Sequence, residues 1–155
     1  MLIQKELEIV VEGKGLYNIT DIINQAISKH RISKGICTIF IKHTSASLII
    51  QENADPNVLK DLENYYDKIV PENDNYLHSE EGPDDMPAHI KSSLTSTTLS
   101  IPIKEKKLDL GIWQGVYLFE HRYKNNDLGI KRIISMTVIA VSYTHLTLPT
   151  TRCGF

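Results

Sequence analysis

Apolar and polar residues alternate along several stretches of the chain, and this period of two predicts β-strands. The stretches with the clearest alternation are residues 2–11, 36–43, 46–51 and 130–141. Residues 97–103 predict a further strand, and residues 108–122 predict either a strand pair or one long bent strand. In the latter segment Gly111 and Gly115 indicate a bulge or a close approach of another backbone.

Apolar residues at helical spacing predict three helices between these strands. The first is expected to begin with Thr20 as its cap. The second is expected to have Asp55 as its cap and Pro56 as its first residue, because proline suits a position whose N–H lacks a partner. The third covers residues 87–94.

The length and composition fit one ordinary domain. The chain has 155 residues, of which 41% are hydrophobic and 23% are charged. We expect residues 1–141 to form this domain. The Thr-rich segment 142–155 breaks the pattern, so we treat it as extraneous to the fold and exclude His145 and Cys153 from the candidate residues.

The charge and hydropathy patterns narrow the function classes. The formal net charge of −2 gives no support for bulk nucleic-acid binding. No apolar run approaches the roughly 20 residues that span a membrane, and the first residues lack a signal-peptide pattern. A cytoplasmic protein is therefore expected. Cys37 lies in an apolar strand and is interpreted as a small buried hydrophobe.

Candidate chemistry gathers in residues 76–93, YLHSEEGPDDMPAHIKSS. This segment holds two histidines, His78 and His89, and four acidic residues, a composition that suggests a divalent cation or a polarised catalytic site. Asp85 and His89 share a helix face, so one carboxylate can orient one imidazole. The alternative interpretation is a helix cap next to a surface histidine.

Two other segments offer candidates. His43 ends a strand whose Cys37, Ile39 and Ile41 lie on the same face, so it is expected at the rim of the core. It is either a working side chain or a core-edge histidine bonded to the backbone.

If residues 114–122 are extended, Gln114, Glu120 and Arg122 share one face, and they either line a site or include a cross-strand charge pair. The opposite face would then carry Trp113, Tyr117 and Phe119 as an exposed apolar load suited to an interface.

Basic residues are concentrated in the second half of the chain. They are Lys104, Lys106, Lys107, Arg122, Lys124, Lys131 and Arg132. These residues are interpreted as solvated hairpin ends, with a phosphate-bearing small substrate as the alternative.

Three motifs together resemble the YjbQ family. They are HTSASLIIQENADP, NYLHSEEGPDDMPAHIKSSL and GIWQGVYLFEHR, and the resemblance extends from residue 4 to residue 141. It implies an α+β fold with mixed or antiparallel sheets, a homotrimer with sites near subunit contacts, and the family's label of secondary thiamine-phosphate synthase. That reaction joins a hydroxymethylpyrimidine diphosphate to a thiazole phosphate and releases diphosphate.

The resemblance also assigns roles to residues. The expected catalytic residues are His43, Asp85, His89 and Glu120. The expected substrate-binding residues are Thr44, Ser45, Asn53, Gln114 and Arg122. A divalent metal is expected, either Zn²⁺ on His43, His78 and His89 or Mg²⁺ on Asp84 and Asp85. Two alternatives stay open: a metal-dependent hydrolase of a small phosphate or amide, and a non-catalytic metabolite-binding trimer.

Overall fold

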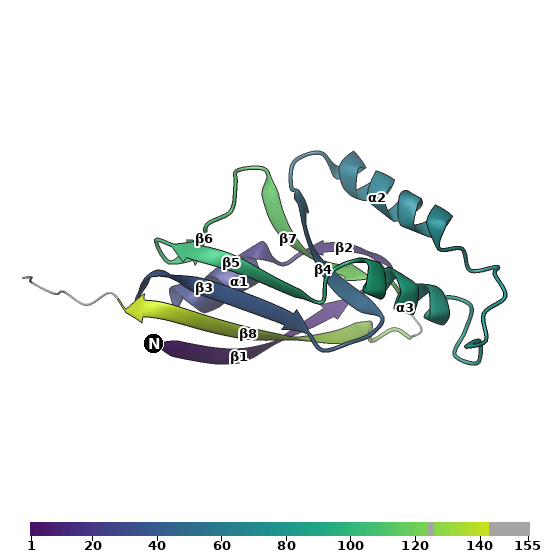
Figure 1. The fold of residues 1–155 in the computed structure, drawn as a ribbon, viewed down its shortest axis with the longest axis horizontal. Coiled ribbons are helices and arrows are strands. Elements are labelled where there is room, and N and C mark those ends of the chain that lie inside the picture. Colours follow the sequence, from purple (N-terminus) through teal and green to yellow (C-terminus); the bar gives the residue numbers. More distant parts are fainter. Residues whose placement is uncertain (124–125, 143–155) are drawn as a thin grey trace, which may run out of the picture.

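A five-stranded antiparallel sheet and a smaller three-stranded antiparallel sheet form the frame of the molecule (Figure 1). The computed structural model describes residues 1–123 and 126–142. The larger sheet consists, in spatial order, of β1 (Leu2–Val11), β8 (Ile130–Ser142), β3 (Ile32–Ile41), β5 (Thr98–Lys104) and β6 (Lys107–Leu108). The smaller sheet consists of β2 (Gly15–Asn18), β7 (Gln114–Glu120) and β4 (Ala46–Glu52).

Three helices complete the expected α+β architecture, in which the described residues form a single domain. They are α1 (Thr20–Ser28), α2 (Pro56–Ile69) and α3 (Asp85–Leu94). Figure 1 shows α1 behind the larger sheet, and α2 and α3 at the far end of the molecule from the β5–β6 turn. Among the described residues, no helix combines the length and apolar character needed to cross a bilayer.

The core is formed by the inward side chains of the larger sheet, α1 and the central part of the smaller sheet. The alternation predicted for β3 is confirmed, since Cys37, Ile39 and Ile41 are all buried. Burial raises the pKa of the Cys37 thiol to about 12, which keeps it an inert apolar side chain, as expected.

The predicted start of α2 is confirmed, because the Asn57 N–H donates to Asp55 Oδ1 at 2.9 Å and Pro56 is the first helical residue. The predicted cap of α1 is wrong. Ile19 occupies the cap position, and the Thr20 hydroxyl instead accepts from the Val116 N–H at 2.8 Å. This bond ties α1 to β7, a partner that local sequence does not reveal.

The predicted exposed apolar face of residues 113–119 is wrong for two of its three members. Tyr117 and Phe119 are buried within the chain, and only Trp113, at 62% exposure, lies open. The Tyr66 ring of α2 packs edge-on against Phe119, with 5.5 Å between ring centroids. Both faces of β7 are therefore covered, and the strand is not a free interface.

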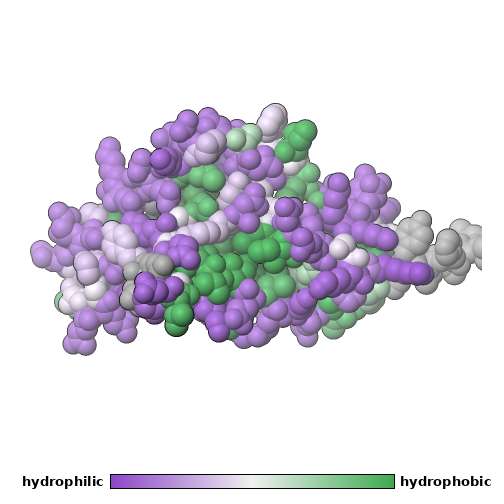
Figure 2. Space-filling model, turned by 180° about the vertical axis from the view of Figure 1, so that it is seen from behind, coloured by the Kyte–Doolittle hydropathy of each residue, from purple (hydrophilic) through white to green (hydrophobic). Residues whose placement is uncertain are grey.

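An apolar row does cross the outer face of the larger sheet. Leu2 pairs with Ile139, Ile139 pairs with Ile36, and Ile36 pairs with Pro102, so the row spans β1, β8, β3 and β5. Ile139, at its centre, is 66% exposed. Figure 2 shows the molecule from behind, where hydrophobic surface also gathers near the middle. An exposed apolar row like the one through Ile139 is typical of a surface that is covered by a partner.

Candidate metal centre

The start of α3 brings three potential metal ligands together. Asp85 and His89 lie one helical turn apart, and the preceding loop places His78 beside them. His78 Nε2 lies 2.6 Å and His89 Nε2 lies 3.3 Å from the same oxygen, Asp85 Oδ2. The imidazole centroids are 5.4 Å apart, and all three ligand atoms fall within 4.8 Å of one another.

Arg122 holds the carboxylates of this segment in place. Its Nη1 donates to Asp85 Oδ1 at 2.6 Å, its Nε donates to Asp84 Oδ2 at 2.9 Å, and its Nη2 donates to the Glu81 carbonyl at 3.0 Å. Asp84 thus occupies the cap position of α3, but its side chain bonds Arg122 and the Tyr123 N–H rather than the helix.

The Asp85 carboxyl is only 2% exposed. Burial by itself would raise its pKa, but the hydrogen bond from His78 and the charge of Arg122 outweigh burial and hold the pKa of Asp85 below its ordinary value. A carboxylate that stays ionised while buried is a strong ligand for a cation.

The orientation of His89 leaves its Nε2 available to a cation. Its Nδ1 lies 3.0 Å from the Thr44 carbonyl, and because a carbonyl only accepts, Nδ1 carries the proton. Nε2 then faces Asp85 Oδ2, and an unprotonated nitrogen would repel that oxygen. Either a second proton on the ring or a cation between the two atoms is required.

The donor set fits a divalent transition metal. Two imidazoles and one carboxylate form a set that Zn²⁺ uses in catalytic sites, with a fourth position left open. Ligands about 2.0–2.1 Å from a tetrahedral ion lie about 3.3 Å from one another. His89 Nε2 and Asp85 Oδ2 already have this separation, whereas the half-exposed His78 ring, whose Nε2 lies 2.6 Å from Oδ2, would have to move outward to bind.

His43 lies outside this group. Its Nε2 accepts the Ile133 N–H at 2.8 Å, so the nitrogen expected to bind metal is already engaged. Burial and the nearby charge of Arg132 lower the pKa of His43, which favours the neutral ring that accepts this N–H. Among the described residues, the third potential metal ligand beside His78 and His89 is Asp85 and not His43. His43 instead borders a cavity of about 260 Å³ with Thr44 and His89.

Glu120, expected to be catalytic, is fully buried in an ion pair with Arg132. Arg132 Nε lies 2.6 Å from Oε1 and Nη2 lies 2.5 Å from Oε2. The N–H groups of His121 and Arg122 also donate to Oε2. With four donors around it, this carboxylate has little capacity left for a substrate.

Arg132 was not among the expected site residues, although a signal for it exists in the sequence. It lies on the core-facing side of β8, the side that also carries the buried Ile134, Met136 and Val138. A charged residue at such a position requires a buried partner, which Glu120 supplies across the fold.

Asn53 and Gln114 lie at the other end of the smaller sheet. Gln114 begins the seven-residue strand β7 and Glu120 ends it, a separation of about 20 Å. Asn53 Nδ2 donates to the Ile112 and Gln114 carbonyls, and Gln114 Oε1 accepts the Gly111 N–H. Within one chain, both amides hold the loop before β7 and are remote from the candidate metal ligands.

A buried histidine lies behind the centre. His121 is 1% exposed, its Nε2 is 2.9 Å from Ser47 Oγ, and among the described residues its Nδ1 has no partner. Burial, together with the charges of Lys91 and Arg132, lowers the pKa of His121 to about 3. The ring is therefore neutral in the folded protein at any ordinary pH.

This burial predicts a pH-dependent stability. An unfolded chain protonates His121 near pH 6.5, whereas the folded chain does so only near pH 3. Between these values the unfolded state binds more protons, so the free energy of unfolding falls with falling pH by up to about 1.4 kcal/mol per pH unit. Urea midpoints of His121→Gln between pH 7 and 4.5 should show a shallower slope than those of the natural chain. Equal slopes would contradict the prediction.

Comparison with known proteins agrees with the fold and shows the family. The family model described as "UPF0047 protein YjbQ-like" matches residues 5–141. A UPF0047 protein of Synechocystis sp. is 52% identical over 122 residues, which cover 78% of this chain and 83% of the relative. The UPF0047 protein YjbQ of Escherichia coli O157:H7 is 42% identical over 136 residues, covering 87% and 96% of the two chains.

Solved structures show the same α+β architecture. A crystal structure of an uncharacterized YjbQ/UPF0047 family protein from Clostridium acetobutylicum matches with a TM-score of 0.74 and 32% identity, covering 88% of this chain and 99% of that one. The fold and the site therefore define a small α+β protein with a histidine–carboxylate centre. The chain belongs to the YjbQ family of UPF0047 proteins. Of the segment expected to be extraneous, residues 142–155, the first residue, Ser142, ends β8, and residues 143–155 with His145 and Cys153 lie outside the described residues.

Proposed function

We propose that this protein is a metal-assisted enzyme that acts on a small phosphorylated metabolite. The observation that carries the proposal is the convergence of His78, Asp85 and His89 on one point beside Arg122. The proposed reaction is the one that the family resemblance implies, in which a thiazole nitrogen displaces diphosphate from a hydroxymethylpyrimidine diphosphate. One C–O bond breaks, one C–N bond forms, and diphosphate leaves with its electron pair.

The residues of this chain have distinct roles in the proposal. His78, Asp85 and His89 would hold a divalent ion, whose chemistry is to stabilise negative charge on phosphate oxygens. Thr44 fixes the His89 ring by accepting from Nδ1, and Arg122 fixes Asp85 through Oδ1. Arg122 also supplies positive charge near the departing diphosphate. Zn²⁺ suits this donor set better than Mg²⁺, which prefers oxygen ligands.

The second candidate function is a metal-dependent hydrolase of a small phosphate. It is favoured by the number of ligands, because three protein ligands leave a position at which zinc enzymes hold water. A metabolite-binding protein without turnover is the remaining possibility.

Metal stripping distinguishes these classes. The chelated protein and the zinc-reloaded protein are compared in thiamine-phosphate formation and against a panel of small phosphate esters. An enzyme of either kind should lose turnover on chelation and regain it with Zn²⁺. Turnover that is unchanged after chelation would contradict metal assistance. Retained ligand affinity without turnover in either assay would favour the binding protein.

We also propose that the protein is a homotrimer, as the family resemblance implies. The apolar row of Leu2, Ile139, Ile36 and Pro102 supports a second copy as its partner, because the row is uncharged and lies on an open sheet face. The helix α2 adds to the exposed apolar surface through Tyr65 and Ile69. Surfaces of this kind form the cores of obligate homo-oligomer interfaces.

The trimer has a direct test. Light scattering of the natural chain should give the mass of three chains, whereas Ile139→Glu should give a single chain of 17.6 kDa, because a charge at the centre of the row opposes burial. Leu128→Glu, which changes an exposed residue of a loop outside the row, is the control and should leave the trimer intact. A monomeric natural chain at micromolar concentration would contradict the proposal.

A further inference from the structure

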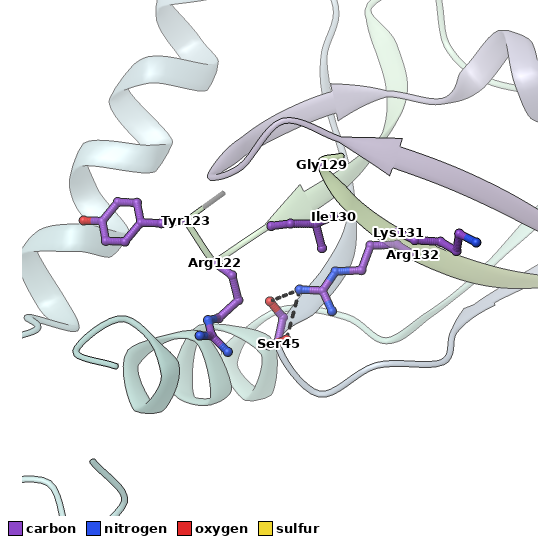
Figure 3. A pocket seen from close by; sticks show the side chains of 7 residues that line it. All are labelled: Ser45, Arg122, Tyr123, Gly129, Ile130, Lys131 and Arg132. Atoms are coloured by element: carbon purple, nitrogen blue, oxygen red, sulfur yellow. Dashed lines mark hydrogen bonds between the residues drawn. The ribbon is translucent and has the colours of Figure 1, made fainter. Parts of the chain in front are cut away.

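A small pocket adjoins the candidate metal centre at the start of β8 (Figure 3). Its cavity measures about 260 Å³, and its lining includes Ser45, Arg122 and Arg132. Pockets that enclose a drug-sized ligand measure about 300–1,000 Å³. This pocket therefore suits one small group of a ligand rather than a whole metabolite, and its two guanidinium groups indicate an anionic group.

Arg132 is held as a rigid donor in this pocket. It is 6% exposed, and Glu120 and Ser45 engage its Nε and Nη2 atoms. In the part of the chain that the structure describes, its remaining nitrogen, Nη1, makes no hydrogen bond to another residue. Figure 3 shows the guanidinium beside Ser45, inside the pocket. A planar fork fixed on one side and free on the other is suited to binding phosphate oxygens.

The pocket and the metal ligands are physically connected. Arg122 lines the pocket, and its Nη1 donates to the oxygen of Asp85 opposite to the one that faces the two imidazoles. Consecutive residues make a second connection, because the Thr44 carbonyl accepts from His89 and Ser45 accepts from Arg132. A ligand group in this pocket therefore lies next to the metal centre.

The charges show when an anion can bind. Two guanidinium groups, Arg122 and Arg132, face the carboxylates of Asp84, Asp85, Glu120 and Glu81. Lys131, which also lines the pocket, is paired with Glu8, so two negative charges are in excess. A divalent cation on His78, Asp85 and His89 would cancel this excess. Without the cation the site repels an anion, and with it the guanidinium groups can bind one.

We infer that this pocket binds the phosphate group of the substrate and does so only when the metal centre is occupied, with Arg132 as the residue that recognises the phosphate. The inference deepens the proposed function and rests on it for the phosphorylated substrate. Because coupling between two ligands is reciprocal, phosphate should also tighten metal binding by the same factor. The order of binding is then metal first and phosphorylated substrate second.

Equilibrium dialysis with radiolabelled inorganic phosphate tests the inference on the full chain. The zinc-loaded protein should bind phosphate at least about fivefold more tightly than the chelated protein, the lower end of typical couplings. Equal phosphate binding with and without zinc would overturn the inference, as would no binding in either state.

Variants assign the effect to Arg132. The double variant Glu120→Gln with Arg132→Met keeps the net charge and removes the fork, and it should lose about tenfold in phosphate affinity while keeping zinc affinity. Lys107→Met, at the opposite edge of the sheet, should bind phosphate like the natural chain. If the double variant does not fold, Arg132→Lys keeps the charge without the free Nη1 and should also weaken binding. Natural affinity in a folded variant at position 132 would overturn the inference.

The experiment separates this inference from the proposed reaction. Zinc-dependent phosphate binding that depends on Arg132, in a protein without turnover on any substrate, would support the pocket and contradict the proposed enzyme. Turnover in a variant at position 132 with unchanged substrate KM and phosphate affinity would support the enzyme and contradict the pocket.

Discussion

His89→Ala abolishes turnover and leaves the fold intact; this is the result we expect in whichever assay shows activity. Among the described residues, the imidazole is one of two in the candidate metal group, and removing it leaves His78 and Asp85 as an incomplete set. Loss of a working histidine typically costs about 10²–10⁴-fold in rate. The ring is partly exposed and makes one hydrogen bond to backbone, so its removal should change the free energy of unfolding by only about 1 kcal/mol or less.

His30→Ala is the matched control, because it removes another partly exposed imidazole at the opposite end of β3 from His43. It should keep natural turnover and natural zinc content. The measurements are turnover, zinc content by elemental analysis and urea unfolding of the three proteins. If His89→Ala retains natural turnover and zinc content, the start of α3 is a capped helix beside an acidic loop and the active site lies elsewhere.

Breaking the Glu120–Arg132 pair from one side should destabilise the protein more than any other single change described above. Arg132→Ala leaves a fully buried carboxylate without its two strongest donors. Glu120→Ala leaves a buried guanidinium without its carboxylate. Removing one partner of a buried pair typically costs about 3–5 kcal/mol, because the remaining charge stays buried without compensation.

The double variant Glu120→Gln with Arg132→Met should be much closer to the natural chain, since it leaves no charge unpaired and keeps similar volumes. Urea unfolding of the natural chain, both single variants and the double variant measures the coupling. A strongly positive coupling is expected. Single variants that cost less than about 1 kcal/mol would show that water reaches the pair and that Arg132 is not the rigid donor described here.

The sequence predicts those features that depend on nearby residues. β1 and β3 follow from alternation, and the cap of α2 follows from Asp55 and Pro56, because neighbours in the chain decide each of these. The strand β2 was not predicted, because four residues are too few to show an alternation of apolar and polar side chains.

The same distinction holds for the site. His78, Asp85 and His89 meet because a short loop and one helical turn join them, so their spacing in the sequence indicates their proximity. Arg132 and Glu120 meet through tertiary packing across the core, and no local pattern predicts that pairing. His43 was expected in the metal group from its strand end, but the backbone of Ile133 on β8 engages its ring instead.

Anomalous scattering from crystals of protein purified without chelator tests the central claim most directly. We expect one strong peak, at the zinc edge, between His78 Nε2, His89 Nε2 and Asp85 Oδ2, with a phosphate or sulfate from the medium in the pocket of Arg132. A peak at another group of residues, or no peak in crystals that elemental analysis shows to be saturated with zinc, would contradict the assignment of the metal centre.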